Sequence, residues 1–336
     1  MSHSIKGRVL VTGGAGFIGS ALVWALNRRG VDDIVVTDQL GTSEKWRNLR
    51  ALRFRDYVEG DDFLTRIRAA PAAYGSFAAV FHLGANSSTT ERDASHLVHA
   101  NYEYTKHLCE WTLAQGARFV YASSAATYGD GAVGMRDDDS ASYLQTLRPL
   151  NMYGYSKHMF DLWALRSGHL SRIVGLKYFN VFGPNESHKG EMRSLVAKAY
   201  DQIRTTGVVK LFKSYRDDCR DGEQQRDFVY VKDAVDATLH FVTGNPTVGG
   251  LFNVGTGRAH TWIELVNAIF AALGRPPRIE FVEMPESMRE KYQYFTRADV
   301  TKLHAAGFLQ PATPLGDAVK DYVQEYLIPE RWLSVT

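Results

Sequence analysis

A glycine-rich loop constrains the fold of this chain more than any other feature. The loop reads TGGAGFIG at residues 12–19 and follows a β-branched run at residues 8–12. Apolar residues at helical spacing come next, over residues 17–29, and Gly30 is a stop signal. The patterns GxGxxG and GxxGxxG both fit the loop, through Gly13, Gly14, Gly16 and Gly19. Such a loop brings backbone close to a pyrophosphate and aims a helix N-terminus at it, so the segment predicts a dinucleotide-binding site.

A carboxylate ends the next expected strand, at residues 34–38. Asp38 stands about 20 residues beyond the loop, where the ribose hydroxyls of a dinucleotide are expected. A carboxylate there accepts from a 2′-hydroxyl and repels a 2′-phosphate, which favours NAD. Five basic residues follow, any of which could screen that phosphate or simply be solvated: Lys45, Arg47, Arg50, Arg53 and Arg55. The residues alone leave the choice between NAD and NADP open.

Short β-branched runs alternate with helical patterns through the first half of the chain, as in βαβ units. Further strands are expected at residues 79–83, 118–122 and 173–179. Two short apolar segments, 228–231 and 251–254, indicate a return to the sheet. The pattern predicts an α/β fold, namely a Rossmann-type doubly wound parallel sheet with a smaller mixed α/β substrate domain.

The rhythm of the sequence changes after Gly183, where loops lengthen and charged residues mix with aromatic ones. We therefore expect a dinucleotide-binding domain made of residues 1–182 and 227–258. The substrate domain is expected to combine residues 183–226 and 259–330.

Composition excludes several other classes of protein. The formal charge is +2, which does not favour nucleic acid as a partner. No apolar run approaches the roughly 18 residues of a membrane span, and no apolar h-region precedes the first strand, so a cytoplasmic protein is expected. Cys109 and Cys219 are too few for a disulfide framework or a four-ligand metal site, and no metal is expected.

A serine, a tyrosine and a lysine form a second group with chemical meaning. Ser124 follows an expected strand, and Tyr153 and Lys157 stand four residues apart on one face of an expected helix. A nearby ammonium favours the phenolate of a tyrosine and can also hold the ribose of a nicotinamide cofactor. The serine hydroxyl can hydrogen-bond the substrate oxygen with which the tyrosine exchanges a proton. Tyr155 points to another face, so Tyr153 is the expected acid/base.

The motifs, in their order, resemble those of extended short-chain dehydrogenases/reductases of the nucleotide-sugar epimerase and dehydratase group. Besides the glycine loop and the Tyr153–Lys157 pair, the resemblance rests on SSAATYG at 123–129, YFNVFGP at 178–184, RDFVYV at 226–231 and FNVGTG at 252–257. Within that group the chain is similar to the ADP-L-glycero-D-manno-heptose 6-epimerase family. That similarity rests on 123–129 again and on NSSTTE at 86–91, HKG at 188–190 and KYQYFT at 291–296.

The resemblance implies a reaction, a cofactor and an assembly. The reaction is inversion of C6 of the heptose in ADP-D-glycero-D-manno-heptose, through a 6-keto intermediate, in the synthesis of lipopolysaccharide core precursors. NADP is implied as the cofactor, with NAD less favoured, and a homo-oligomer, a pentamer by resemblance. Tyr153 and Lys189 would be the two acid/base groups, assisted by Ser124 and Lys157. A solvated lysine or a diphosphate clamp are the alternatives for Lys189.

The glycine loop and the resemblance together assign the remaining site residues. Those expected at the cofactor are Gly13, Gly16, Phe17, Ile18, Gly19, Asp38, Gln39, Lys45, Leu83, Gly84, Ala85, Asn86, Ser87, Lys157 and Val181. Those expected at the ADP-sugar are Asn180, Lys189, Phe212, Lys213, Ser214, Tyr215, Arg226 and Tyr292. Leu83 and Asn86 depart from the Glu and Cys that relatives often carry. The segment 214–226 is longer than usual and is either a solvated loop or part of a lid.

Three alternative functions differ in testable ways. A UDP-sugar 4-epimerase would share the cofactor and Tyr153, but the HKG segment at 188–190 favours the ADP-heptose reaction. A 4,6-dehydratase needs a further acid and base after the serine strand, where this chain has Ala125 and Ala126. A non-catalytic dinucleotide sensor would have no use for Ser124, Tyr153 and Lys157 together.

Overall fold

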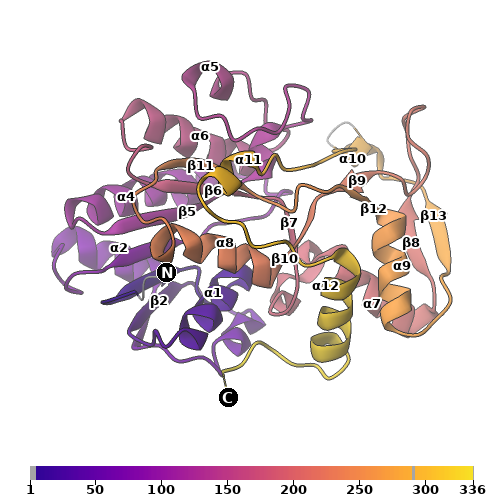
Figure 1. Cartoon of the computed structure of the whole chain (residues 1–336), viewed down its shortest axis with the longest axis horizontal. Helices are drawn as coiled ribbons and strands as arrows, with labels where there is room; N and C mark the ends of the chain where they lie inside the picture. Colours follow the sequence, from indigo (N-terminus) through magenta and orange to yellow (C-terminus); the bar gives the residue numbers. More distant parts are fainter. Residues whose placement is uncertain (1–4, 290–291, 336) are drawn as a thin grey trace.

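The centre of the structure, a computed structural model that describes residues 5–289 and 292–335, is a seven-stranded parallel sheet (Figure 1). Its strands, in order across the sheet, are β11 (Gly250–Val254), β6 (Val174–Tyr178), β5 (Arg118–Ser124), β4 (Ala79–His82), β1 (Val9–Thr12), β2 (Ile34–Asp38) and β3 (Asp56–Glu59). The strand order reverses between β1 and β4, which is where ligands bind in sheets of this kind. The doubly wound α/β class is confirmed.

Helices cover both faces of the sheet. On one face α1 (Phe17–Arg28) packs against α8 (Val231–Thr243) (Figure 1). Right-handed crossovers place α2 (Gly60–Ala69), α4 (Tyr104–Ala114) and α6 (Met152–Arg166) on the other. Because both faces are covered, every residue of β1 and β4 is buried.

A smaller group of elements lies beside the carboxyl ends of the sheet. Strands β8 (Val209–Phe212) and β13 (Ile279–Val282) pair in parallel there. The helices of this group are α7 (Leu195–Thr206), α9 (Trp262–Ala272) and α12 (Leu315–Asp321), and α9 packs against both of the others. The short helices elsewhere are α3 (Ala94–Leu97), α5 (Ala141–Leu144), α10 (Glu286–Arg289) and α11 (Thr301–Ala305).

Two short pairs of strands connect the sheet to this smaller group. Strand β7 (Asn180–Phe182) pairs in parallel with β10 (Phe228–Tyr230), and β9 (Gln225–Arg226) pairs antiparallel with β12 (His260–Thr261). The expectation that residues 228–231 return to the main sheet is therefore wrong, whereas residues 251–254 do return, as β11. Strand β6 pairs with β5 on one side, so only its other side is free for a further strand. Strand β11 takes that place, which leaves none for residues 228–231.

The sheet has one strand that the sequence pattern did not indicate. Strand β3 pairs with β2 at the edge of the sheet, and only one of its four residues is buried. A strand so weakly buried has no apolar run to reveal it. Within the described part of the chain, none of the helices is long and apolar enough to cross a membrane.

Candidate active site

The glycine loop has the shape that a pyrophosphate requires. Gly13 has φ of +66°, and a Cβ there would lie 2.6 Å from the Cα of Gly84. A Cβ on Gly19 would lie 2.0 Å from the carbonyl oxygen of Gly13. Helix α1 starts directly after Gly16 with no side chain capping its N-terminus, so its first N–H groups are available to a ligand. The residues present therefore fit a bound dinucleotide.

Asp38 holds the glycine loop in place. Its Oδ2 accepts from the backbone N–H groups of Ala15 (2.9 Å) and Gly16 (3.1 Å). Its Oδ1 accepts from the backbone of Gln39 and from the Lys45 ammonium, both at 2.7 Å. The Asp38 carboxylate is thus paired with the Lys45 ammonium, and this pairing reduces its repulsion of a 2′-phosphate.

The other basic residues after Asp38 are directed elsewhere. Arg47 pairs with Glu44, Arg53 with Asp32 and Arg55 with Asp33, whereas the Arg50 guanidinium lies 4.5 Å from the centre of the Trp332 ring. Among these five basic residues, Lys45 is the one that lines the cavity described next. The interpretation of the four arginines as surface residues is the one that fits the structure.

A cavity of about 840 Å³ brings most of the predicted site residues together. It follows the carboxyl ends of the central strands toward β8. The predicted residues that line it are Gly13, Gly16, Phe17, Ile18, Gly19, Asp38, Lys45, Leu83, Gly84, Ala85, Ser87, Ser124, Tyr153, Lys157, Asn180, Val181, Lys189, Phe212 and Tyr292. Gln39 and Asn86 line a neighbouring cavity of about 610 Å³, which also reaches Asp38 and Lys45.

Ser124, Tyr153 and Lys157 meet at the middle of this cavity. Ser124 ends β5, and its Oγ accepts from the N–H of Ala126 at 3.1 Å. Helix α6 begins with Asn151 as its cap, whose Oδ1 accepts from Gly154 N at 2.8 Å. The helix approaches so closely that a Cβ on Gly154 would lie 2.7 Å from the Ala126 carbonyl oxygen. This contact sets Tyr153 beside Ser124.

Burial dominates the protonation of both α6 residues. It raises the pKa of Tyr153 above its ordinary value, and a hydrogen bond with Ser124 acts in the opposite direction. It lowers the pKa of Lys157 to about 8, against the attraction of the Asp161 carboxylate. The expected effect of Lys157 on the phenolate stays a prediction. Because burial outweighs the hydrogen bond with Ser124, the pKa of Tyr153 stays above its ordinary value, which favours the phenol form.

Lys189 reaches the same cavity from the other side. It lies in the 3₁₀ segment Ser187–Met192, and its Nζ is 5.3 Å from the centre of the Phe17 ring. Burial lowers its pKa, and the carboxylate of Glu186 opposes that shift. Glu186 is fully buried and anchors the segment by accepting from Ser194 Oγ at 2.6 Å. Lys189 is partly buried and lines the cavity, and its role as an acid/base group or as a diphosphate clamp stays a prediction.

Two buried asparagines join the Lys189 segment to the glycine loop, and sequence reasoning missed both. The Nδ2 of Asn48 lies 2.9 Å from the carbonyl oxygen of Ala15, 3.1 Å from that of Asn185 and 3.2 Å from Nδ1 of His188. Asn185 has φ of +76°, and its Oδ1 accepts from Leu333 N at 3.0 Å. The one available signal was the Gly-Pro-Asn turn that ends at Asn185, because asparagine tolerates positive φ.

Three predicted substrate residues line the far end of the cavity. Asn180 starts β7, and its Oδ1 accepts from Thr296 Oγ1 at 3.4 Å. Phe212 ends β8. The hydroxyl of Tyr292 accepts from the Trp262 indole at 2.8 Å, and Trp262 also lines the cavity. Lys291, the first residue of the KYQYFT segment, lies outside the described residues.

Arg226 supports this wall and does not line the cavity. Its guanidinium lies 5.5 Å from the centre of the Trp262 ring and 5.2 Å from that of Tyr292. The side chain is almost fully buried, and its Nη1 donates to the carbonyl oxygen of Gln225 at 2.8 Å. In this arrangement Arg226 fixes the position of two aromatic rings that face the cavity.

The other three predicted substrate contacts stand outside the cavity lining. The Lys213 ammonium is 2.6 Å from Oε1 of Glu283, and the Tyr215 hydroxyl donates to the same carboxylate. The backbone N–H of Ser214 donates to Asp221 at 2.6 Å. Ser214 is thus held within its own loop, whereas Lys213 and Tyr215 are held by Glu283, the residue after β13, and the contact of all three with a substrate stays a prediction.

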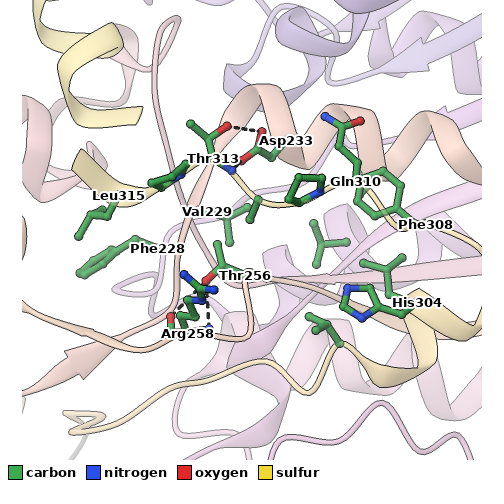
Figure 2. A pocket seen from close by; sticks show the side chains of 18 of the residues that line it. Phe228, Val229, Asp233, Thr256, Arg258, His304, Phe308, Gln310, Thr313 and Leu315 are labelled. Atoms are coloured by element: carbon green, nitrogen blue, oxygen red, sulfur yellow. Dashed lines mark hydrogen bonds between the residues drawn. The ribbon is translucent and has the colours of Figure 1, made fainter. Parts of the chain in front are cut away.

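A third cavity, of about 440 Å³, lies behind Phe228 (Figure 2). Its walls are mostly apolar and come from β10, β11 and the segment 303–315. The Asp233 carboxylate inside it is engaged by the backbone and hydroxyl of Thr313, both at 2.8 Å. None of the described residues that line this cavity is a predicted site residue, so the functional site is the larger cavity on the other side of Phe228.

The fold and the larger cavity define a class of protein. A helix N-terminus for a pyrophosphate, with a serine, a tyrosine and a lysine beside it, is the arrangement of an enzyme of the short-chain dehydrogenase/reductase type, which works with a nicotinamide dinucleotide. Residues 9–255 match the NAD dependent epimerase/dehydratase family. The chain belongs to that family, and its curated relatives place it in the branch of ADP-L-glycero-D-manno-heptose-6-epimerases.

Two curated relatives illustrate this. The ADP-L-glycero-D-manno-heptose-6-epimerase of Nitratidesulfovibrio vulgaris (strain DP4) is 54% identical over 318 residues, which cover 95% of this chain and 97% of that protein. The enzyme of the same name from Fusobacterium nucleatum is 44% identical over 329 residues, covering 96% and 98%.

Solved structures agree with the fold. The Helicobacter pylori ADP-L-glycero-D-manno-heptose-6-epimerase superposes with a TM-score of 0.78 at 26% identity, covering 96% of each chain. The UDP-N-acetylglucosamine 4-epimerase of Methanobrevibacter ruminantium superposes with a TM-score of 0.80 at 23% identity, covering 98% of this chain and all of that one. The second likeness shows the fold alone.

Proposed function

We propose that this chain inverts C6 of the heptose in ADP-D-glycero-D-manno-heptose to give ADP-L-glycero-D-manno-heptose, a precursor of the lipopolysaccharide core. The observation that carries the proposal is that Tyr153 and Lys189 line one cavity from two different elements, α6 and the segment after β7. Inversion at an exocyclic carbon needs a proton partner in each of two orientations of the sugar side chain. The names of the curated relatives support the same reaction.

We infer that the dinucleotide is NADP. A bound nicotinamide dinucleotide would supply reversible hydride transfer at C6 of the sugar. The glycine loop would hold the pyrophosphate, Lys157 the ribose beside the nicotinamide, and Lys45 the 2′-phosphate. The support for a 2′-phosphate is the ammonium of Lys45, which lies 2.7 Å from Asp38, and both residues line the two neighbouring cavities.

The two proton partners differ in their resting charge. Burial keeps Tyr153 in its phenol form, ready to donate a proton to an oxygen that gains negative charge. Burial also lowers the pKa of Lys189, which makes its neutral amine more accessible as a base. Ser124 hydrogen-bonds Tyr153 and would steady the same substrate oxygen. Pairs of groups whose pKa values are displaced in opposite directions are suited to serve as acid and base.

The two residues after Ser124 argue against water elimination. Ala125 and Ala126 follow Ser124 in the segment Ala125–Tyr128, so neither position offers an acid or a base. A dehydratase needs both near C5 and C6 of its sugar. A simple epimerisation needs nothing more than the groups already described.

The remaining expectations also belong to this proposal. We propose that the enzyme works in the cytoplasm as a homo-oligomer, a pentamer by family resemblance, with its dinucleotide-binding and substrate domains divided as the sequence predicts. Light scattering coupled to size-exclusion chromatography checks the assembly directly.

A product analysis tests the proposed reaction. The purified protein is incubated with ADP-D-glycero-D-manno-heptose, and NMR resolves the two C6 epimers at equilibrium. UDP-galactose serves as the parallel substrate. Formation of the L-glycero epimer, with UDP-galactose unchanged, is expected. Conversion of UDP-galactose to UDP-glucose with ADP-heptose untouched would instead assign a UDP-sugar 4-epimerase.

A further inference from the structure

A fully buried ion pair lies beneath the active site, and the proposed reaction does not account for it. The Lys177 ammonium on β6 is 2.7 Å from Oδ2 of Asp161 on α6, and neither side chain has any exposed surface. Removing two charges from water costs free energy that their attraction repays only with good geometry, so buried pairs are poor devices for stability. The pair therefore calls for another explanation.

The position of Asp161 on α6 supplies one. Tyr153, Lys157 and Asp161 are spaced by four residues each, so the carboxylate lies on the same face of the helix, one turn beyond Lys157. Asp161 also accepts from the Tyr121 hydroxyl at 2.8 Å and from Ser123 Oγ at 2.9 Å. Together with Lys177, these hydroxyls give the carboxylate three donors, which fix its orientation one helical turn from Lys157.

The partner of Asp161 connects the network to the catalytic serine. Lys177 also donates to Thr127 Oγ1 at 2.7 Å, and that hydroxyl donates to the carbonyl oxygen of Ser124 at 2.8 Å. Ser123, which donates to Asp161, precedes Ser124 on β5. Both sides of Ser124 are therefore tied to the same buried pair.

The titratable groups around Lys157 come from four elements. These groups are Tyr153 and Asp161 on α6, Tyr121 on β5, His82 on β4 and Lys177 on β6. His82 is neutral, because burial and the nearby Lys157 lower its pKa to about 3. Burial raises the pKa of both tyrosines, so they are neutral as well. Asp161 is thus the anion that faces Lys157.

We propose that Asp161 is a positioning residue that keeps Lys157 charged and aligned. The link to catalysis rests on the proposed function, in which Lys157 holds the cofactor ribose. The electrostatic effect on Lys157 does not rest on it. Attraction by Asp161 opposes the burial that lowers the pKa of Lys157.

The test reads the charge of Lys157 directly. Protein labelled with [13Cε]lysine is titrated by NMR, and the Lys157 signal is assigned by its absence in Lys157→Met. In the unaltered protein its midpoint is expected near pH 8. Asp161→Asn should lower the midpoint by about one pH unit or more, since an opposite charge at close range shifts a pKa by about 1–3.

Lys177→Met is the matched control, because it breaks the same ion pair but leaves the carboxylate. It should leave the Lys157 midpoint unchanged or raise it. If Asp161→Asn does not fold, the double variant Asp161→Asn/Lys177→Met is compared with Lys177→Met. The Lys157 midpoint should be lower in the double variant, which lacks the carboxylate. Equal midpoints with and without Asp161 would overturn the proposal. No substrate is used, so failure of the proposed reaction would be seen separately, in product analysis of the unaltered protein.

Discussion

Replacing Lys45 by alanine should weaken the binding of NADP and leave the binding of NAD almost unchanged. The Lys45 ammonium is 2.7 Å from Asp38, and the two side chains are 19% and 9% exposed, so the pair is only partly screened by water. Lys45→Ala removes the cation proposed to meet the 2′-phosphate and leaves the Asp38 charge unpaired beside it. Loss of one charge-assisted contact costs about 1–3 kcal/mol, which is roughly a 5- to 150-fold weaker affinity for NADP.

The assay is calorimetric titration of the nucleotide-stripped protein with NADP and with NAD. Affinity for NAD should hardly change in Lys45→Ala, because NAD has no 2′-phosphate to lose. Arg53→Ala is the matched control, since Arg53 follows in the same basic segment but pairs with Asp32 at 2.9 Å and lies outside the cavity lining. A preference of the unaltered protein for NAD, or equal weakening of both cofactors in Lys45→Ala, would refute this role of Lys45.

Three further substitutions test the rest of the site. Tyr153→Phe should preserve the fold and cofactor binding but reduce epimerase turnover on the order of 10²-fold or more, because it removes the proton partner of the C6 oxygen; near-normal turnover in a folded protein would contradict the assignment. Lys189→Met should lower kcat with little change in KM for the ADP-sugar, whereas a raised KM with unchanged kcat would support a diphosphate clamp. Asn48→Ala leaves the carbonyls of Ala15 and Asn185 without a buried donor and should lower the free energy of unfolding by about 1–3 kcal/mol, measured by urea denaturation; an unchanged midpoint would show that the asparagine does not hold the two loops together.

Local spacing in the sequence was enough to predict much of the fold and the centre of the site. The strands β1, β2, β4, β5 and β6 were expected from β-branched runs within one or two residues of their bounds. The glycine loop and the Tyr153–Lys157 pair depend on spacing within a single turn or helix. For such features the neighbours that matter are close in sequence, so the pattern itself carries the information.

Local spacing in the sequence could not predict which side chains form the walls of the cavity. Arg226 is predicted to contact the substrate, but in the structure it lies outside the cavity lining, next to the Tyr292 and Trp262 rings, so that contact stays a prediction. Whether a side chain on a two-residue strand faces a cavity or supports its wall depends on the partner strand, and β12 is far away in sequence. Segment 228–231 was expected in the main sheet for a related reason, because an apolar run does not specify which edge it joins.

The sequence by itself determined the fold class, the dinucleotide loop and the catalytic tyrosine and lysine candidates, because each depends on contacts between residues a few positions apart. Only the tertiary structure decided how Lys189 is held opposite Tyr153. Asn48 and Asn185 join its segment to the glycine loop across 137 residues of chain. Asp161 meets Ser123 across 38 residues, and no local periodicity marks either contact. Buried polar groups need hydrogen-bond partners, and the tertiary fold decides which distant residues provide them.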